Sequence, residues 1–210
     1  MSYTVKEMFL TLQGEGMQAG RKAVFLRFAG CNLWTGREQD RATAVCQFCD
    51  TDFVGTDGVN GARYADAEAV AMKAGELWGE DRTKAYIVCT GGEPLLQLDA
   101  PLIDALHAQG FEIAVETNGT IAAPKGIDWL CVSPKAGSEV VQRSGDELKL
   151  VWPQGGIDPG ELLSWGFSNF LIQPMDCEEA DAARRAAMDY VRAHPEWRLT
   201  LQTHKMLGIP

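Results

Sequence analysis

Three cysteines in the segment 30–52 have the types and spacing that carry chemistry. The segment reads GCNLWTGREQDRATAVCQFCDTD, with two residues between Cys46 and Cys49 and fourteen between Cys31 and Cys46. A structural zinc site normally has four cysteine or histidine ligands, and only three thiols gather here, with no histidine nearby in the sequence. Three thiolates leave one iron of an iron-sulfur cluster open, so that it can bind a small molecule.

The cysteine spacing alone leaves other interpretations open. A thioredoxin-like Cys46/Cys49 pair, a three-thiolate zinc with a distant fourth ligand, and reduced cysteines without a function are together about as well supported as the cluster. Cys89 and Cys131 lie inside apolar runs, and we expect them to be small buried side chains.

A second motif, TGGEPLLQ (90–97), follows an apolar run and precedes a helical pattern. We expect its glycines to bring bare backbone close to a ligand at the carboxyl end of a strand. Together with CNLW and CQFCDT, it resembles the radical S-adenosylmethionine enzymes. In that superfamily three cysteines hold a 4Fe-4S cluster, and a GGEP stretch binds the methionine amino group.

Further motifs narrow the resemblance to the 7-carboxy-7-deazaguanine synthase family. They are LQGEG (12–16), FLRFAGCNL (25–33), CDT (49–51), ETNGT (116–120), VSPK (132–135), QPMD (173–176) and QTHKMLGIP (202–210). The resemblance implies a Mg²⁺-dependent ring contraction of 6-carboxy-5,6,7,8-tetrahydropterin to 7-carboxy-7-deazaguanine, with release of ammonia, in queuosine and 7-deazapurine biosynthesis. One departure stands out, because radical S-adenosylmethionine enzymes usually have three residues between their first two cysteines.

The resemblance also implies the residues of the site. Cys31, Cys46 and Cys49 are expected to hold the 4Fe-4S cluster, and Thr51 to bind Mg²⁺. For S-adenosylmethionine, the expected contacts are Phe48, Asp50, Gly92, Glu93, Glu116, Asn118, Ser133, Pro134, Lys135, Gln173 and Asp176. For the substrate, they are Leu12, Gln13, Gly14, Glu15, Arg27, Thr90, His204 and Pro210. The Pro210 carboxylate is expected to accept hydrogen bonds from the 2-amino group and ring N–H of the substrate.

Several of these assignments have a purely structural alternative. Asn118 and Gly119 could form only a turn, because Asn-Gly is a strong turn signal. Asp50 and Thr51 could simply cap a turn, and Arg27 could only pair with Glu15. A free C-terminus is frayed in most proteins.

Seven β-rich runs separated by helical patterns must position these residues. The runs are 22–30, 85–90, 111–117, 128–133, 147–152, 169–174 and 197–202, and several are almost continuously apolar, as in parallel sheets covered on both faces. Helical periodicity appears in 64–78, 99–109 and 178–193. We predict one α/β domain over 1–210. Its fold is a partial, mostly parallel (β/α) barrel of the radical S-adenosylmethionine type with about six strands and about three main helices, because a complete barrel needs about 250 residues.

The loop 32–45 carries an insertion of eleven residues relative to the usual cysteine spacing. It is polar, with alternating charge, and we predict a short surface helix beside the cluster. Loop closure entropy grows only slowly with length, so the insertion need not disturb the cluster. It is either a neutral insertion or a docking element for the electron donor.

The overall charge and hydropathy exclude some partners. The formal net charge is −10, which disfavours direct nucleic-acid binding. No apolar run reaches the roughly 18 residues of a membrane span, and the N-terminus lacks the layout of a signal peptide, so we expect a cytoplasmic protein. The resemblance further implies a homodimer and a flavodoxin or ferredoxin type electron donor.

Two other functions are compatible with some of these motifs. An activase that installs a glycyl radical on a partner protein shares CNL and GGEPLLQ, but it would not account for LQGEG or QTHKMLGIP. A non-catalytic, zinc-stabilised binding module would need only the cysteines.

Overall fold

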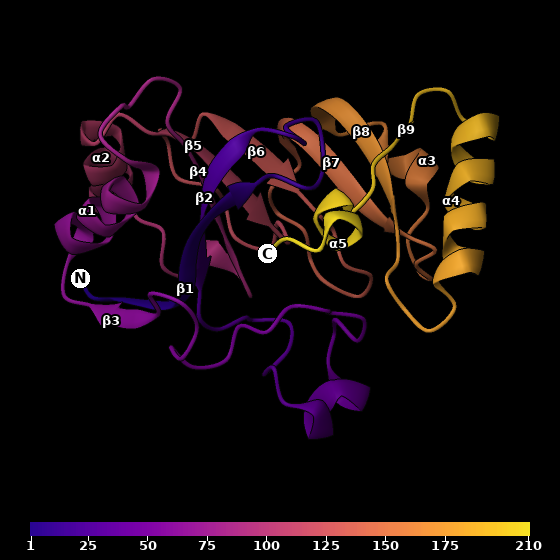
Figure 1. Ribbon diagram of the computed structural model, residues 1–210. Helices are drawn as coiled ribbons and strands as arrows, with labels where there is room; N and C mark the ends of the chain where they lie inside the picture. Colours follow the sequence, from indigo (N-terminus) through magenta and orange to yellow (C-terminus); the bar gives the residue numbers. More distant parts are fainter.

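The computed structural model describes residues 1–210 and has a single nine-stranded sheet at its centre (Figure 1). The strands lie in the order β3-β1-β2-β4-β5-β6-β7-β8-β9. β1 is antiparallel to both of its neighbours, and all other neighbouring strands are parallel. The bounds are β1 Tyr3–Leu12, β2 Lys22–Phe28, β3 Ala62–Tyr64, β4 Tyr86–Gly91, β5 Glu112–Thr117, β6 Trp129–Val132, β7 Ser144–Trp152, β8 Gly166–Pro174 and β9 Arg198–Leu199. The sheet is open between β3 and β9, which confirms a partial, mostly parallel barrel.

Helices cover the sheet at its two ends (Figure 1). α1 and α2 lie together at one end, whereas α3 and α4 lie at the other, and α5 returns to the middle of the molecule. The bounds are η1 Glu38–Thr43, α1 Ala67–Trp78, η2 Pro94–Leu96, α2 Ala100–Ala108, α3 Pro159–Leu162, α4 Ala180–Ala193 and α5 Thr203–Leu207. The three predicted main helices are confirmed as α1, α2 and α4.

Two strands and the length of a third differ from the prediction. β1 was not predicted because a bulge between Val5 and Glu7 breaks its period-two alternation, and because Lys6 is buried within it. β3 spans only three residues. The expected strand 197–202 is reduced to the short β9; Thr200 N–H still donates to the Ile172 carbonyl of β8 at 2.9 Å, whereas Thr203 N–H donates to Gly14.

The core forms where apolar strands meet the buried faces of the helices. Tyr86 to Cys89 of β4 are completely buried, as expected for a central parallel strand. α1 buries Val70 and Ala74. Cys89 and Cys131 are both buried, in agreement with the sequence analysis. The parallel strands bring their carboxyl ends to the same edge, where such folds place their sites.

The 32–45 insertion leaves the sheet and returns to nearly the same point. The backbone N–H groups of Val45 and Cys46 both donate to the carbonyl of Leu33, at 3.1 and 3.3 Å, which closes the base of the loop. Its tip forms η1 and extends away from the body of the protein (Figure 1). The predicted short helix is therefore confirmed.

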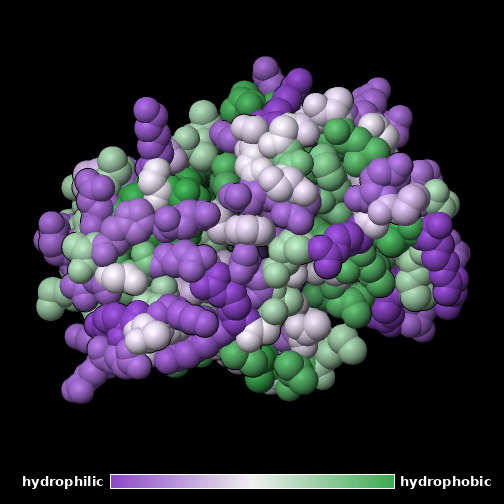
Figure 2. Space-filling view, turned by 90° about the horizontal axis from the view of Figure 1, so that it is seen from above, coloured by the Kyte–Doolittle hydropathy of each residue, from purple (hydrophilic) through white to green (hydrophobic).

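No helix is long and apolar enough to cross a membrane. In the view of Figure 2, the end that carries α1 and α2 is mostly hydrophilic, whereas separate hydrophobic patches lie toward the other end.

Candidate active site

A cavity of about 380 Å³ opens at the carboxyl ends of the strands. Its lining includes every residue predicted to contact the substrate, from Leu12 to Pro210, together with Cys46, Cys49 and Thr51. Of the residues predicted to contact S-adenosylmethionine, only Glu93 and Pro134 are not part of the lining. Positions nearly two hundred residues apart thus share one cavity.

The cysteine loop is packed directly against the Gly91–Gly92 turn. A Cβ atom on Gly92 would lie 2.3 Å from the Gly30 carbonyl oxygen and 2.6 Å from the Cys31 Cβ. The Glu93 N–H donates to the same Gly30 oxygen at 2.9 Å. The glycine pair therefore allows close contact between the loops after β2 and β4, in addition to presenting Gly92 to the cavity.

Glu93 itself is not part of the cavity lining, although its neighbour Gly92 is. Its side chain is fully buried behind the cavity wall, where the carboxylate accepts hydrogen bonds from Leu95 N–H at 2.9 Å, Thr117 Oγ1 at 2.7 Å and Asn118 N–H at 2.8 Å. Burial raises the Glu93 pKa. The carboxylate fixes the turns after β4 and β5 and does not reach the cavity.

Pro134 also lies outside the cavity lining, between Ser133 and Lys135, which both belong to it. The Gln154 side-chain amide donates to the Pro134 carbonyl oxygen at 3.4 Å. The Lys135 ammonium donates to the Ser133 hydroxyl at 2.7 Å and lies 5.8 Å from the centre of the Phe48 ring. Burial lowers the Lys135 pKa, while the nearby Cys46 and Cys49 thiols act in the opposite direction.

Asn118 both lines the cavity and holds a turn. Its side-chain oxygen accepts from Thr120 N–H at 2.9 Å, and its amide donates to the Asn32 side chain at 3.0 Å. Asn118 can therefore belong to a turn and line the cavity at the same time, so the two interpretations of ETNGT are compatible.

The three thiols could accommodate an iron-sulfur cluster. All six cysteines of the chain are free. Burial raises the pKa of Cys31, and the Leu33 N–H, 3.4 Å from its sulfur, partly offsets this. No three thiol, imidazole or carboxylate groups converge on a single metal-ion position. The three thiols lie close enough together for Cys49 to raise the pKa of both Cys31 and Cys46, and this all-thiol donor set suits iron-sulfur ligation.

Both carboxylates that flank Thr51 already have lysine partners. Asp50 lies 2.5 Å from the Lys205 ammonium, and Asp52 lies 2.7 Å from the Lys6 ammonium. Burial opposes ionisation of Asp50, but Lys205 outweighs it, and the Asp50 pKa falls below its ordinary value. Thr51, between them, also lines the cavity, and its hydroxyl is the uncharged side-chain oxygen of this segment.

A buried lysine organises the acidic floor of the cavity. The Lys149 ammonium lies 2.5 Å from a Glu15 oxygen and 3.6 Å from a Glu116 oxygen. Gln13 donates to Glu116 at 2.9 Å, and Gln202 donates to Glu15 at 3.0 Å. Burial raises the Glu15 pKa, but the Lys149 charge dominates, and the net shift is downward.

The predicted alternative partner of Arg27 is wrong. Arg27 pairs with Glu7, with its Nε 2.8 Å from Oε1, and Glu15 pairs with Lys149 instead. The reason is the antiparallel register of β1 and β2, which places Glu7 directly opposite Arg27.

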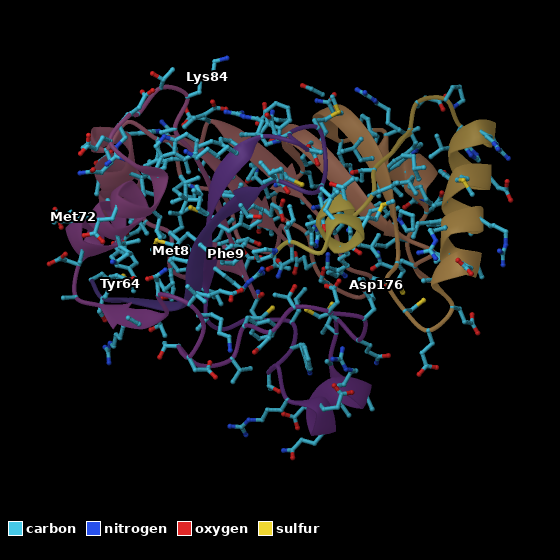
Figure 3. All side chains as sticks on the ribbon, in the orientation of Figure 1. Met8, Phe9, Tyr64, Met72, Lys84 and Asp176 are labelled. Carbon is cyan, nitrogen blue, oxygen red and sulfur yellow. The ribbon has the colours of Figure 1, made fainter.

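The C-terminal segment closes one side of the cavity. The Thr203 hydroxyl and N–H both donate to the Gly14 carbonyl, at 2.8 and 2.9 Å, and Thr11 Oγ1 donates to the Pro210 oxygen at 2.9 Å. His204, remote in sequence, thereby joins the lining. Lys205 bridges Asp50 to Asp176 at 2.6 Å, and Figure 3 shows Asp176 beside α5.

Sequence reasoning missed several charged and aromatic residues of the lining. Lys149 carried a usable signal, because a lysine inside the apolar run ELKLVW must find a buried partner. Lys6, Gln202 and Lys205 gave no comparable local signal. Phe9 and Phe25 were hidden by the bulge in β1, which obscured the pairing of the two strands.

The open sheet, with free thiols beside a polar cavity at its carboxyl edge, defines an α/β enzyme built on the partial barrel of radical S-adenosylmethionine enzymes. No protein-family model matches the chain. Over full length it is 60% identical to the 7-carboxy-7-deazaguanine synthase of Caulobacter vibrioides and 61% identical to that of Bradyrhizobium diazoefficiens, covering 100% of each chain. The crystal structure of QueE from Escherichia coli matches with a TM-score of 0.71 at 27% identity, over 96% of this chain and 94% of that one. The chain belongs to the 7-carboxy-7-deazaguanine synthase family.

Proposed function

We propose that this enzyme uses a 4Fe-4S cluster, S-adenosylmethionine and Mg²⁺ to convert 6-carboxy-5,6,7,8-tetrahydropterin into 7-carboxy-7-deazaguanine and ammonia. The observation that carries the proposal is the convergence of residues from Leu12 to Pro210 on one cavity that Cys46 and Cys49 line, with Cys31 packed against Gly92 just outside the lining. The high identity to named synthases over full length supports it further.

Cys31, Cys46 and Cys49 would hold the cluster. When bound, the cluster and S-adenosylmethionine supply the abstraction of an unactivated hydrogen atom from the substrate. A ligand contact in the cavity is supported by Gln173, a lining residue whose Oε1 is buried and has no hydrogen-bond partner in the protein. A buried polar atom of this kind normally has a partner, and a bound cofactor would provide one.

The remaining residues bind and orient the substrate. Arg27 supplies the cation for the substrate carboxylate, and the carboxylates of Glu15 and Pro210 accept hydrogen bonds from the pyrimidine edge. Thr51 would contribute one oxygen to Mg²⁺, which retains most of its water ligands, while Asp50 is held by Lys205. The protein thus contributes position and exclusion of water rather than an acid–base pair.

Anaerobic reconstitution followed by product analysis tests the proposal. Reduced enzyme with S-adenosylmethionine, Mg²⁺ and the tetrahydropterin should yield 7-carboxy-7-deazaguanine and ammonia, detected by mass spectrometry and an ammonia assay. Cys46→Ala should lose both the iron-sulfur absorbance and the product, because one cluster ligand is missing.

Cys177→Ala is the matched control, since Cys177 is exposed and lies outside the cavity lining. It should retain the iron content and turnover of the wild type. Product formation by Cys46→Ala at the wild-type rate would contradict the assignment of the cluster ligands.

A second experiment addresses the C-terminus. Residues appended after Pro210 should weaken substrate binding, because they remove the terminal carboxylate from the cavity. Unchanged affinity, measured by calorimetry, would exclude the proposed role of that carboxylate.

We also propose a flavodoxin or ferredoxin type electron donor, a homodimer and a cytoplasmic location, which follow from the family resemblance.

A further inference from the structure

We infer that Glu7 is a positioning residue that aims Arg27 into the cavity and so makes the enzyme select substrates that carry a carboxylate. The inference rests on the proposed function, because it concerns recognition of the same substrate. It begins from the pairing of β1 with β2, where Glu7 and Arg27 are directly opposite each other.

The ion pair uses only one nitrogen of the guanidinium group. Arg27 Nε donates to Glu7 Oε1 at 2.8 Å, and neither terminal nitrogen of Arg27 has a protein partner. Both side chains are largely buried, at 19% exposed for Arg27 and 26% for Glu7, and both line the cavity. The terminal nitrogens are not among the fully buried unpaired atoms, so they remain accessible from the cavity.

This arrangement suits bidentate recognition of a carboxylate. A guanidinium group presents its donors in a rigid planar fork, and two parallel N–H···O bonds give both strength and directional specificity. Glu7 occupies the Nε side of the fork and leaves the terminal end for a ligand. A long arginine side chain without such a partner would lose this orientation, since many rotamers are open to it.

A neighbouring cross-strand pair lies beside the Glu7–Arg27 pair. Phe9 and Phe25 stack with ring centres 5.8 Å apart and an interplanar angle of 10°, and both line the cavity. They lie two residues from Glu7 and Arg27 on the same face of the strands. Figure 3 shows Phe9 near the middle of β1. The aromatic pair thus gives the cavity an apolar wall against which a flat ring can pack.

If net charge alone governed binding, removing Glu7 would have the opposite effect on anion binding. Glu7 partly neutralises Arg27, so removing it would strengthen attraction of any anion if net charge alone governed binding. If orientation governs binding, removal weakens recognition of the carboxylate and leaves the rest of the ligand unaffected. The two accounts therefore differ in the sign of the change.

Ligand discrimination provides the test. Reconstituted enzyme with S-adenosylmethionine and Mg²⁺ is titrated calorimetrically with 7-carboxy-7-deazaguanine and with 7-deazaguanine, which lacks the carboxylate. The wild type should prefer the carboxylated ligand. Glu7→Ala and Glu7→Ser, neither of which reaches Nε, should each reduce this preference by about 10-fold to 100-fold, as expected for loss of a charge-assisted contact. Glu7→Gln, which keeps an acceptor for Nε, should retain most of it.

Glu112→Ala is the control, because it releases Arg21 from a two-bond ion pair outside the cavity lining. Its ligand preference should equal that of the wild type. Equal weakening of both ligands in Glu7→Ala, or tighter binding of the carboxylated one, would overturn the inference while leaving the proposed function intact. A wild type that makes no product from the tetrahydropterin would instead remove the proposed function, and the inference with it.

Discussion

Lys149 determines the electrostatic state of the cavity floor. Burial opposes its charge, but Glu116 and Glu15 together hold its pKa well above the ordinary value. One ammonium between two carboxylates leaves a net negative charge under the substrate site. Such a floor favours the hydrogen-bond donors of a pyrimidine edge over acceptors.

Replacing Lys149 by Met should destabilise the protein strongly. The substitution leaves Glu15 and Glu116 without their cation, and removing one partner of a buried ion pair costs about 3–5 kcal/mol. Denaturant unfolding at pH 7 measures the change. Lys73→Met, which breaks an exposed pair with Glu76 on α1, should cost less than about 1 kcal/mol.

The pH dependence of this effect has a definite sign. In the wild type the Glu15 pKa is lowered, so its stabilising contribution is present at neutral pH and is lost as the pH falls through the folded-state pKa. In Lys149→Met the same carboxylate is buried without its cation and keeps only the hydrogen bond from Gln202, so burial raises its pKa. The stability deficit of the variant should therefore shrink below about pH 5. A deficit that stays constant from pH 8 to pH 4 would contradict this account.

The helices α1 and α2, which cover one end of the sheet, each begin at an aspartate, and the two aspartates have different additional roles. Asp66 caps α1 by accepting from Ala69 N–H at 2.9 Å. Asp99 caps α2 by accepting from Leu102 N–H at 3.1 Å, and it also accepts from the hydroxyl of the buried Tyr3 at 2.6 Å. The second cap therefore ties α2 to the first strand.

Asp66→Ala should cost about 1 kcal/mol of unfolding free energy, the usual value of an N-cap. Asp99→Ala should cost about 1–3 kcal/mol more, because the Tyr3 hydroxyl then loses its partner. Chemical denaturation compares the two variants directly. In Asp99→Ala combined with Tyr3→Phe, much of the additional cost should disappear; persistence of the full cost would show that the hydroxyl is unimportant.

Most central strands and main helices were predictable because their patterns are local and regular. The apolar run at 85–90 and the face formed by Val70 and Ala74 each indicate one structure. β1 was not predictable, since its bulge shifts the alternation by one residue and buries Lys6. The cause of the failure is thus a local irregularity that only tertiary pairing stabilises.

The candidate site, like the fold, was predictable only in part. Residues carried by contiguous motifs, such as Ser133 and Gln173, could be named from the sequence, and the structure places them in one cavity. The lysines that neutralise Asp50 and Asp52 could not, because those ion pairs join segments 155 and 46 positions apart. The burial of the Glu93 side chain behind the cavity wall could not be predicted, because a motif identifies a residue without showing which way its side chain points.

The protein as a whole is closed by its own C-terminal segment. Lys205 joins Asp50 of the cysteine loop to Asp176 after β8, and both ion pairs are partly exposed. Burial opposes the Lys205 charge, but the two aspartates raise its pKa. These contacts connect the first and last thirds of the chain across the cavity.

Lys205→Ala should loosen this closure with little effect on global stability. Exposed ion pairs contribute about 0–1 kcal/mol each, so the unfolding free energy should fall by less than about 2 kcal/mol. Hydrogen exchange of the amides in 202–210 should accelerate, and substrate affinity should fall. Arg192→Ala, which breaks the exposed pair with Asp189 on α4, is the control and should change neither. Unaltered exchange in Lys205→Ala would show that the other contacts suffice.

The return of the C-terminus to the first hairpin also sets an order for biosynthesis. Contacts between Thr203 and Gly14, and between Pro210 and Thr11, join residues separated by nearly the entire chain. Such contacts form late, because their loop-closure entropy is offset only after the intervening sheet has assembled. A chain emerging from the ribosome can therefore complete its central strands and still lack one wall of the cavity. We expect the site to retain a ligand only after the segment 202–210 has joined the first hairpin.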